Sequence, residues 1–193
     1  MAKRSTIPTE SLSSETEALY QVLNEESDLA AILIGVAFID ACLASLLEKK
    51  FVAGETSSAL LNEGPLGSMM SRAQLCYAMG LIPKKWYQDL RTLAEMRNRV
   101  AHNHLALSFE DHDIASHCGR LSSYVSVMGS DAEGRNRFIL CVVMLSNFLI
   151  LDALSLQQLG RPTRRELPKS TALKLEAPRS RSSRLASRLS DDS

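Results

Sequence analysis

The residue types best suited to chemistry lie in one stretch of the chain, residues 93–104, where basic, amide and imidazole side chains interrupt an apolar pattern. Arg97, Asn98 and His102 form the pattern Arg-Asn-x-x-x-His within it. A neutral imidazole can exchange a proton with a ribose hydroxyl because its unperturbed pKa is about 6.5. A guanidinium can bind a phosphate and the charge that develops on it. The three residues are therefore candidates for RNA cleavage without a metal, with Asn98 orienting the imidazole or the phosphate.

Helix geometry limits that chemistry. Asn98 and His102 are four residues apart and share a face, whereas Arg97 is turned by about 140° from His102. A second copy of the helix, packed across a two-fold axis, could bring two such sets into one cleft, so catalysis would require a homodimer. Spacing alone favours a structural role, in which Arg97 pairs with Asp40 or Glu48 and the histidine bonds a backbone carbonyl.

The remaining histidines and the cysteines do not form a recognisable site. His102 and His104 are two residues apart, which does not place two ligands on one helix face. His112 and His117 are five apart, with the same consequence, so no metal is expected. The cysteines are widely spaced, as expected of buried, reduced thiols: Cys42, Cys76, Cys118 and Cys141. No glycine-rich phosphate loop or Ser/His/Asp set stands out, so no cofactor is expected.

Apolar side chains recur with helical spacing along most of the chain, and no stretch alternates as a strand would. Helices are predicted from residue 13 or 14, over 28–51, 68–79 and 83–102, from 108, and over 135–159. Residues 54–67 carry glycine and proline and are predicted to form a connection, and 129–134 a loop. The expected fold class is therefore all-α, a helical bundle.

Three polar residues within these helices lead to specific expectations. One stripe of the helix 83–102 predicts that Arg97 faces the buried side, since it continues Trp86, Leu90, Leu93 and Val100. Asp40 interrupts the apolar middle of 28–51, either as a carboxylate hydrogen-bonded inside the bundle or as the partner of Arg97 or a histidine. Ser108 is the expected N-cap of the helix that follows it.

Charge is distributed unevenly along the chain. Residues 161–193 carry nine Lys/Arg and four Asp/Glu, a net charge of +5, which leaves 13 basic and 18 acidic residues, −5, in residues 1–160. An acidic body argues against broad nucleic-acid binding by the fold itself. No helix-turn-helix with a basic exposed face is evident, so direct DNA binding is expected only through the basic tail.

Three parts are expected in sequence order. Residues 1–12 form a disordered tail without an apolar signal core, 13–160 a helical domain, and 161–193 a disordered basic tail rich in Arg and Ser. The charge-free apolar runs 29–39 and 138–151 are shorter than the roughly 18–20 residues of a membrane span. The sequence therefore predicts a cytoplasmic protein without a membrane anchor.

The hexapeptide from Arg97 to His102 resembles the Arg-Asn-x-x-x-His signature of the HEPN superfamily. These proteins are dimeric helical bundles that include metal-independent endoribonucleases of toxin and defence systems. The resemblance implies a HEPN-like bundle that forms a homodimer. It also implies catalytic roles for Arg97 and His102, with Asn98 in support, and leaves RNA open as a partner.

A longer stretch, about residues 28–155, contains three further motifs: Gly64-Pro65-Leu66-Gly67, the turn Tyr77-Ala78-Met79-Gly80 and the Arg-x4-His spacing. In these motifs the chain resembles the mannitol operon repressor family, which also lacks an evident DNA-binding motif. This resemblance implies a negative regulator of gene expression that acts through a protein partner. The longer match favours that function, and a toxin or stress-response endoribonuclease, as in toxin–antitoxin systems, is the alternative.

Overall fold

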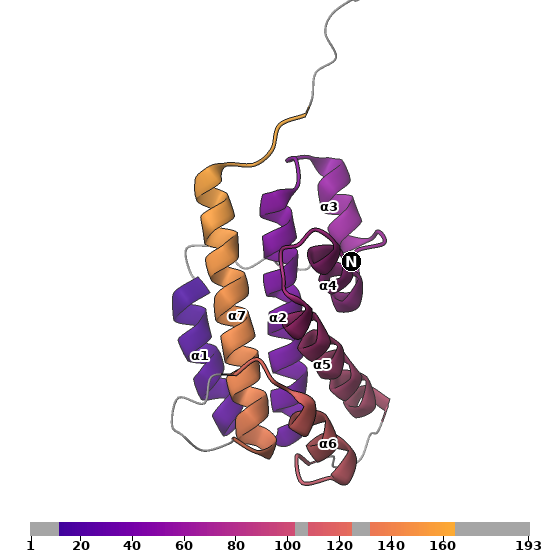
Figure 1. The fold of residues 1–193 in the computed structure, drawn as a ribbon, viewed down its shortest axis with the longest axis vertical. Coiled ribbons are helices and arrows are strands. Elements are labelled where there is room, and N and C mark those ends of the chain that lie inside the picture. The colour runs from indigo at the N-terminus through magenta and orange to yellow at the C-terminus, as the bar shows by residue number, and fades with distance from the viewer. Residues whose placement is uncertain (1–11, 103–107, 125–131, 165–193) are drawn as a thin grey trace, which may run out of the picture. The chain divides into compact units, whose positions relative to one another are not determined.

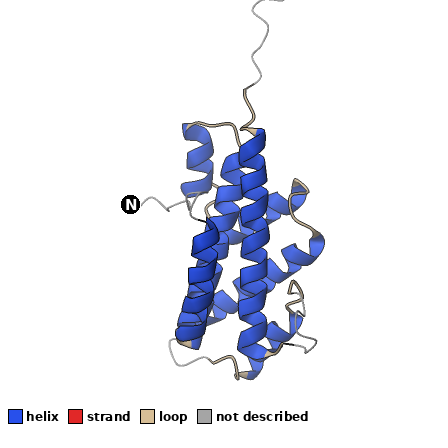
Figure 2. Cartoon of the chain, turned by 90° about the vertical axis from the view of Figure 1, so that its left-hand side faces the viewer, coloured by secondary structure: helices blue, strands red, loops and turns tan. Residues whose placement is uncertain are grey.

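This computed structural model describes residues 12–102, 108–124 and 132–164. Within these ranges the chain is helical and contains no strand (Figure 2). The helices, in chain order, are α1 (Leu12–Glu25), α2 (Asp28–Lys50), α3 (Glu55–Asn62), α4 (Met69–Ala78), α5 (Lys84–His102), α6 (His112–Arg120) and α7 (Gly134–Leu159). The all-α fold class is thus confirmed. The predicted tails, residues 1–12 and 161–193, lie almost entirely outside the described residues.

The two longest helices, α2 and α7, pack against each other at the centre of the bundle (Figure 1). Arg135 at the start of α7 is paired with Asp28 at the start of α2. Arg161, just beyond the end of α7, is bonded to Glu48 near the end of α2 at 2.7 Å. The two helices therefore run parallel, and α1 packs on both of them.

Three of the remaining helices, α3, α4 and α5, pack against α2. Helices α4 and α5 pack on α2 and on each other, α3 contacts α2, and α6 contacts α5 and α7. The largest side chains that are almost fully buried come from most of these elements: Leu23, Ile32, Ile39, Leu43, Leu46, Leu47, Arg72, Leu90, Leu93, Met96 and Phe138. All but one of them are apolar, so burial of apolar surface stabilises the fold, and Arg72 is the exception that needs partners.

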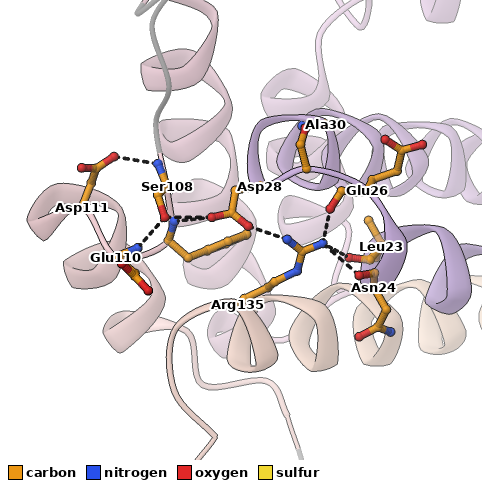
Figure 3. A network of polar contacts seen from close by, with 11 residues as sticks. Leu23, Asn24, Glu26, Asp28, Ala30, Ser108, Glu110, Asp111 and Arg135 are labelled. Carbon is orange, nitrogen blue, oxygen red and sulfur yellow. Dashed lines mark hydrogen bonds and ion pairs between the residues drawn. The ribbon is translucent and has the colours of Figure 1, made fainter.

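A polar network joins the starts of α2 and α7 to the turn before α6 (Figure 3). The Asp28 carboxylate accepts hydrogen bonds from the Ser108 hydroxyl and the Phe109 backbone N–H, both at 2.9 Å. Arg135, the ion-pair partner of Asp28, also donates to the Leu23 carbonyl at 2.7 Å. Burial acts to raise the pKa of Asp28, but these hydrogen bonds and the guanidinium together lower it below its usual value.

The start and the end of α4 agree with the helix predicted over residues 68–79. The Ser68 hydroxyl accepts from the Ser71 N–H at 3.1 Å and caps α4. At the other end Gly80 adopts φ +70°, and its N–H and that of Leu81 bond to carbonyls of the last turn. This is a Schellman motif, which requires a left-handed residue and so suits glycine.

Two predictions about elements are wrong. Residues 54–67 are not a simple connection, because α3 lies within them and buries Leu61. The glycine and proline residues stand at its two ends and leave a helix-compatible run between them. Ser108 does not cap α6, which begins at His112. The Ser108 side chain is instead bonded to Asp28, and its N–H to the Asp111 carboxylate at 2.6 Å.

Helices α2 and α7 are both long and apolar enough to cross a membrane by length and composition, once a few charged residues are allowed in the stretch. Their apolar stretches are 56% and 44% buried inside the bundle, respectively. Core helices of water-soluble proteins have the same character, so this is weak evidence for a membrane span.

Candidate functional site

A cleft of about 1330 Å³ opens between α2, α5 and the segment from α3 to the start of α4. Its α2 wall is built of small residues, Ala37, Ala41 and Ala44, and Ala94 faces it from α5. These alanines leave open space between the two helices, and the longer side chains of Glu48 and Arg97 also line the cleft. Charged and amide side chains lie along the same cleft, which makes it the candidate site among the described residues.

Arg72 lies in the wall of the cleft and is only 2% exposed. Its guanidinium is paired with Asp40 of α2 and donates to the Leu61 carbonyl of α3 at 2.8 Å. The Arg72 Nε has no hydrogen-bond partner among the described residues. This arrangement settles the two alternatives for Asp40, because its carboxylate pairs inside the bundle with Arg72 and not with Arg97.

Arg97 and Asn98 lie on the α5 side of the cleft, and both are exposed. The Arg97 Nη1 donates to the Asn98 Oδ1 at 3.2 Å. The prediction that Arg97 faces the buried side is wrong. The buried face of α5 follows Leu93, Met96 and Val100, and Arg97 lies just outside that face. Arg97 makes no ion pair with any of the described residues, and the Asp40 and Glu48 carboxylates bond Arg72 and Arg161.

His102 is the last residue of α5, and its side chain lies outside what the structure describes. The helix is continuous from Arg97 to His102, so the turn of about 140° between the two positions holds. A single chain therefore gives no support for Arg97 and His102 acting on one atom. The His104 position falls wholly outside the described residues.

The other two histidines lie on α6. His112 is exposed, 3.9 Å from an Asp113 oxygen. His117 is buried, with Nδ1 against the Asp113 carbonyl and Nε2 3.6 Å from a Glu95 oxygen. No group of three or more His, Cys, Asp or Glu able to hold a metal ion occurs in the described parts of the chain.

Two carboxylates hold α5 to the α6 segment and so fix the wall that carries Arg97. Asp89 is 1% exposed and accepts from the backbone N–H groups of Ser122 and Ser123 at 3.1 and 2.6 Å. Glu95 bonds Arg120 at 3.1 Å. The first contact is buried and contributes more than the second, which is exposed and screened by water.

The cysteines do not supply a nucleophile. All four are free and buried. Burial raises the pKa of Cys76 and of Cys118 to about 12, and it raises the pKa of Cys141 as well. The thiol forms therefore predominate at neutral pH, and the reactive thiolate is scarce.

Sequence reasoning did not single out Arg72, Asp89 or Arg135, although each organises a polar contact of the fold. A signal for Arg72 was present, because it shares a helix stripe with Met69 and Cys76, which are both buried. A charged residue on an apolar stripe requires a carboxylate elsewhere, and Asp40 was the unassigned carboxylate.

The cleft offers one guanidinium, that of Arg97, with no carboxylate partner among the described residues. Such a group can bind an anion. It is accompanied by the amide of Asn98, while the remaining charges of the cleft are largely used in the fold. No histidine is among the described residues that line the cleft, and of its carboxylates, Asp40 and Glu48 are paired with arginines.

Comparison with known proteins bears on the family and on the fold. The sequence model of a family described as mannitol repressor matches residues 15–140, which is more than half of the chain. The X-ray structure of the MtlR–HPr complex from Escherichia coli is similar, with a TM-score of 0.58 and 17% sequence identity. That match covers 70% of this chain and 98% of the other, and at this identity it shows the fold alone. A search of curated proteins finds no match.

Proposed function

The chain belongs to the mannitol repressor family, and on that premise we propose that it is a cytoplasmic negative regulator of gene expression that acts through a protein partner. The family match carries this proposal. The charge of −5 over residues 1–160 supports it, because an acidic body disfavours direct contact with DNA.

HPr is the partner that we propose. The similar structure from Escherichia coli is that of a complex with HPr, and its chain is matched over 98% of its length. The shared fold gives the same scaffold and not the same surface residues, so HPr is the first partner to test and its binding must be measured. Transcription would then respond to the amount of HPr available for binding.

The test combines binding with genetics. Purified full-length protein is titrated with HPr from the same organism, and transcripts of mannitol-utilisation genes are measured with the gene present, deleted and restored. We expect saturable binding of HPr and higher transcript levels in the deletion. Absence of binding, or transcript levels that do not change on deletion, would reject the proposal.

The alternative, a metal-independent endoribonuclease of HEPN type, is the weaker proposal. Its support is the position of Arg97 and Asn98 together on one side of the cleft. It requires a homodimer in which the Arg97 of one copy and the His102 of the other reach the same phosphate. Wild-type protein and His102→Ala are compared for RNA degradation without added metal and for growth arrest on expression. Identical behaviour of the two proteins removes the alternative.

A further inference from the structure

Two walls of the cleft carry hydrogen-bond donors that have no acceptor among the described residues. On the α5 wall, the Arg97 guanidinium makes one such contact, from its Nη1 to the Asn98 Oδ1 at 3.2 Å. The Asn98 Nδ2 group donates to none of the described residues. Both side chains are exposed and line the cleft, so they offer several N–H donors to a molecule bound there.

The second set of donors lies at the start of α4, where Ser68, Met69 and Met70 line the cleft. The Ser71 N–H is bonded to the Ser68 hydroxyl at 3.1 Å, whereas the N–H groups of Met69 and Met70 have no acceptor in the described parts of the chain. The first turn of α4 contains no acidic side chain, although Glu55 supplies one to the first turn of α3. The partial positive charge at the α4 N-terminus is therefore not compensated within its own helix.

Arg72 is an independent indication of a ligand on the same side of the cleft. It lines the cleft and is only 2% exposed. Its terminal nitrogens bond Asp40 and the Leu61 carbonyl, but its Nε has no partner among the residues that the structure describes. A buried N–H without an acceptor is unfavourable, and a bound ion or water would satisfy it. Walls with this many unpaired donors favour a ligand rich in acceptor oxygens, that is, an oxyanion.

The other groups of the cleft indicate a small anion and not a polyanion. The exposed Glu55 carboxylate lines the α3 side, and residues 1–160 carry a net charge of −5. A chain of phosphates such as RNA would meet this negative charge, whereas a single anionic group can stay at Arg97 and the α4 N-terminus. Ser58 and Asn62 of α3 also line the cleft and can bond hydroxyl groups. A volume of about 1330 Å³ has room for a molecule of hexose size.

We propose that the cleft binds a small organic anion, a hydroxylated molecule of about hexose size that carries one phosphate or carboxylate group. Arg97, Asn98 and the first N–H groups of α4 bind the anionic group, and Ser58 and Asn62 bond the hydroxyls. This goes beyond the proposed function, because it requires neither HPr nor RNA cleavage and each can fail without the other. Since the molecule contacts several helices at once, its binding also stabilises the bundle.

Three six-carbon probes test the class of ligand: glucose, glucose 6-phosphate and gluconate. Each is titrated into full-length ¹⁵N-labelled protein. We expect saturable shifts of the backbone amide resonances of Met69, Met70 and Asn98 with at least one of the two anions, and none with glucose at the same concentrations. The anion that binds more tightly identifies the recognised group as phosphate or carboxylate.

Two variants test the two sets of donors, each with a matched control. Arg97→Gln should weaken binding of the tighter anion at least tenfold, whereas Arg91→Gln removes the same charge from α5 outside the cleft and should stay within twofold of wild type. Ser71→Asp places a carboxylate in the first turn of α4, so it should weaken binding several-fold without lowering the thermal midpoint. The neutral Ser71→Asn should stay within twofold. Circular dichroism confirms that each variant is folded.

Equal binding of glucose and the anions would overturn the proposal, as would unchanged affinity in both Arg97→Gln and Ser71→Asp. A single-stranded RNA oligonucleotide that shifts the same resonances at lower concentration than either anion would overturn it too, and would favour the endoribonuclease. The absence of any shift with all three probes would also reject the proposal. Binding of HPr and the transcript measurement would then still stand as a separate test of the proposed function.

Discussion

Arg72 joins three helices through one guanidinium, and its removal should be costly. Breaking a buried ion pair costs about 3–5 kcal/mol, because the remaining charge stays buried. The Asp40 side chain is 22% exposed, so we expect the lower end, about 3 kcal/mol, for Arg72→Met in urea denaturation. The double variant Arg72→Met with Asp40→Leu should recover most of the loss.

Arg91→Ala is the control for this measurement, since Arg91 is exposed on α5. It should change the free energy of unfolding by less than about 0.5 kcal/mol. A loss in Arg72→Met as small as that in the control would show that the pair contributes little to stability.

Asp28 makes stability depend on pH in a definite direction. Its pKa is lowered in the folded protein, so its ionised form stabilises the fold at any pH above its unfolded pKa of about 3.9. That contribution is lost as the pH falls through the lower, folded value. We expect Asp28→Asn to be less stable than wild type at pH 7, with a difference that shrinks below about pH 4.

Urea denaturation at a series of pH values measures this difference. Asn24→Ala serves as a control, because Asn24 does not ionise and its side chain, among the described residues, bonds the Tyr20 carbonyl of its own helix at 2.7 Å. Its difference from wild type should be independent of pH. A constant difference for Asp28→Asn across the same range would contradict the role assigned to its carboxylate.

At this scale the sequence indicated which residues are unusual but not which ones meet. Arg97, Asn98 and Asp40 were all recognised as requiring an explanation. The pairing of Asp40 with Arg72 depends on how α4 packs against α2, which spacing within one helix does not report. The exposure of Arg97 depends on which of two adjacent stripes of α5 faces the core, and Arg97 is turned by about 100° from the buried Met96.

At the scale of the helix, replacing two glycines by alanine should change the stability of the fold in opposite directions. Gly80 has φ +70°, so Gly80→Ala forces a side chain into the left-handed region and should destabilise by about 1–2 kcal/mol. Gly119 lies within α6, and an added Cβ there meets nothing within 4 Å. Gly119→Ala should therefore stabilise by about 0.5–1 kcal/mol.

Thermal denaturation of both variants beside wild type checks this pair of expectations. An added Cβ at Gly80 also meets nothing within 4 Å, so any loss there comes from the backbone and not from a clash. Equal effects in the two variants would mean that the conformation of Gly80 is not what fixes the end of α4.

The strongly periodic helices were predictable because a continuous apolar stripe determines them. The predicted ranges 28–51, 83–102 and 135–159 each differ from the observed helix by one residue at most at either end. Short helices were not predictable in the same way. Helix α3 has too few residues for periodicity, and the start of α6 was displaced because Ser108 bonds Asp28, a residue far away in sequence.

At the scale of the whole molecule, charge separates the basic C-terminal segment from the acidic remainder. Residues 165–193 carry most of the basic charge of the tail. If the protein is retained by DNA at low salt, we expect that retention to disappear when these residues are removed. Gel-shift titrations at two salt concentrations test this, and undiminished retention after truncation would place the contact on the helices.

The truncated protein should also keep the thermal midpoint of the full chain. The pairing of Arg161 with Glu48 stays in place, because both residues precede the cut. A lower midpoint would mean that the segment contributes to the stability of the fold.

Helices α2 and α7 pack against each other although they are far apart in the sequence, and this affects how the protein folds during translation. Residues 51–133 separate the two helices, so α2 leaves the ribosome long before the helix that covers it most extensively. Contacts so distant in sequence must be reached against the entropy of closing a long loop. During that interval α2, one of the most apolar segments of the chain, is exposed to non-native association. Aggregation is therefore favoured during translation.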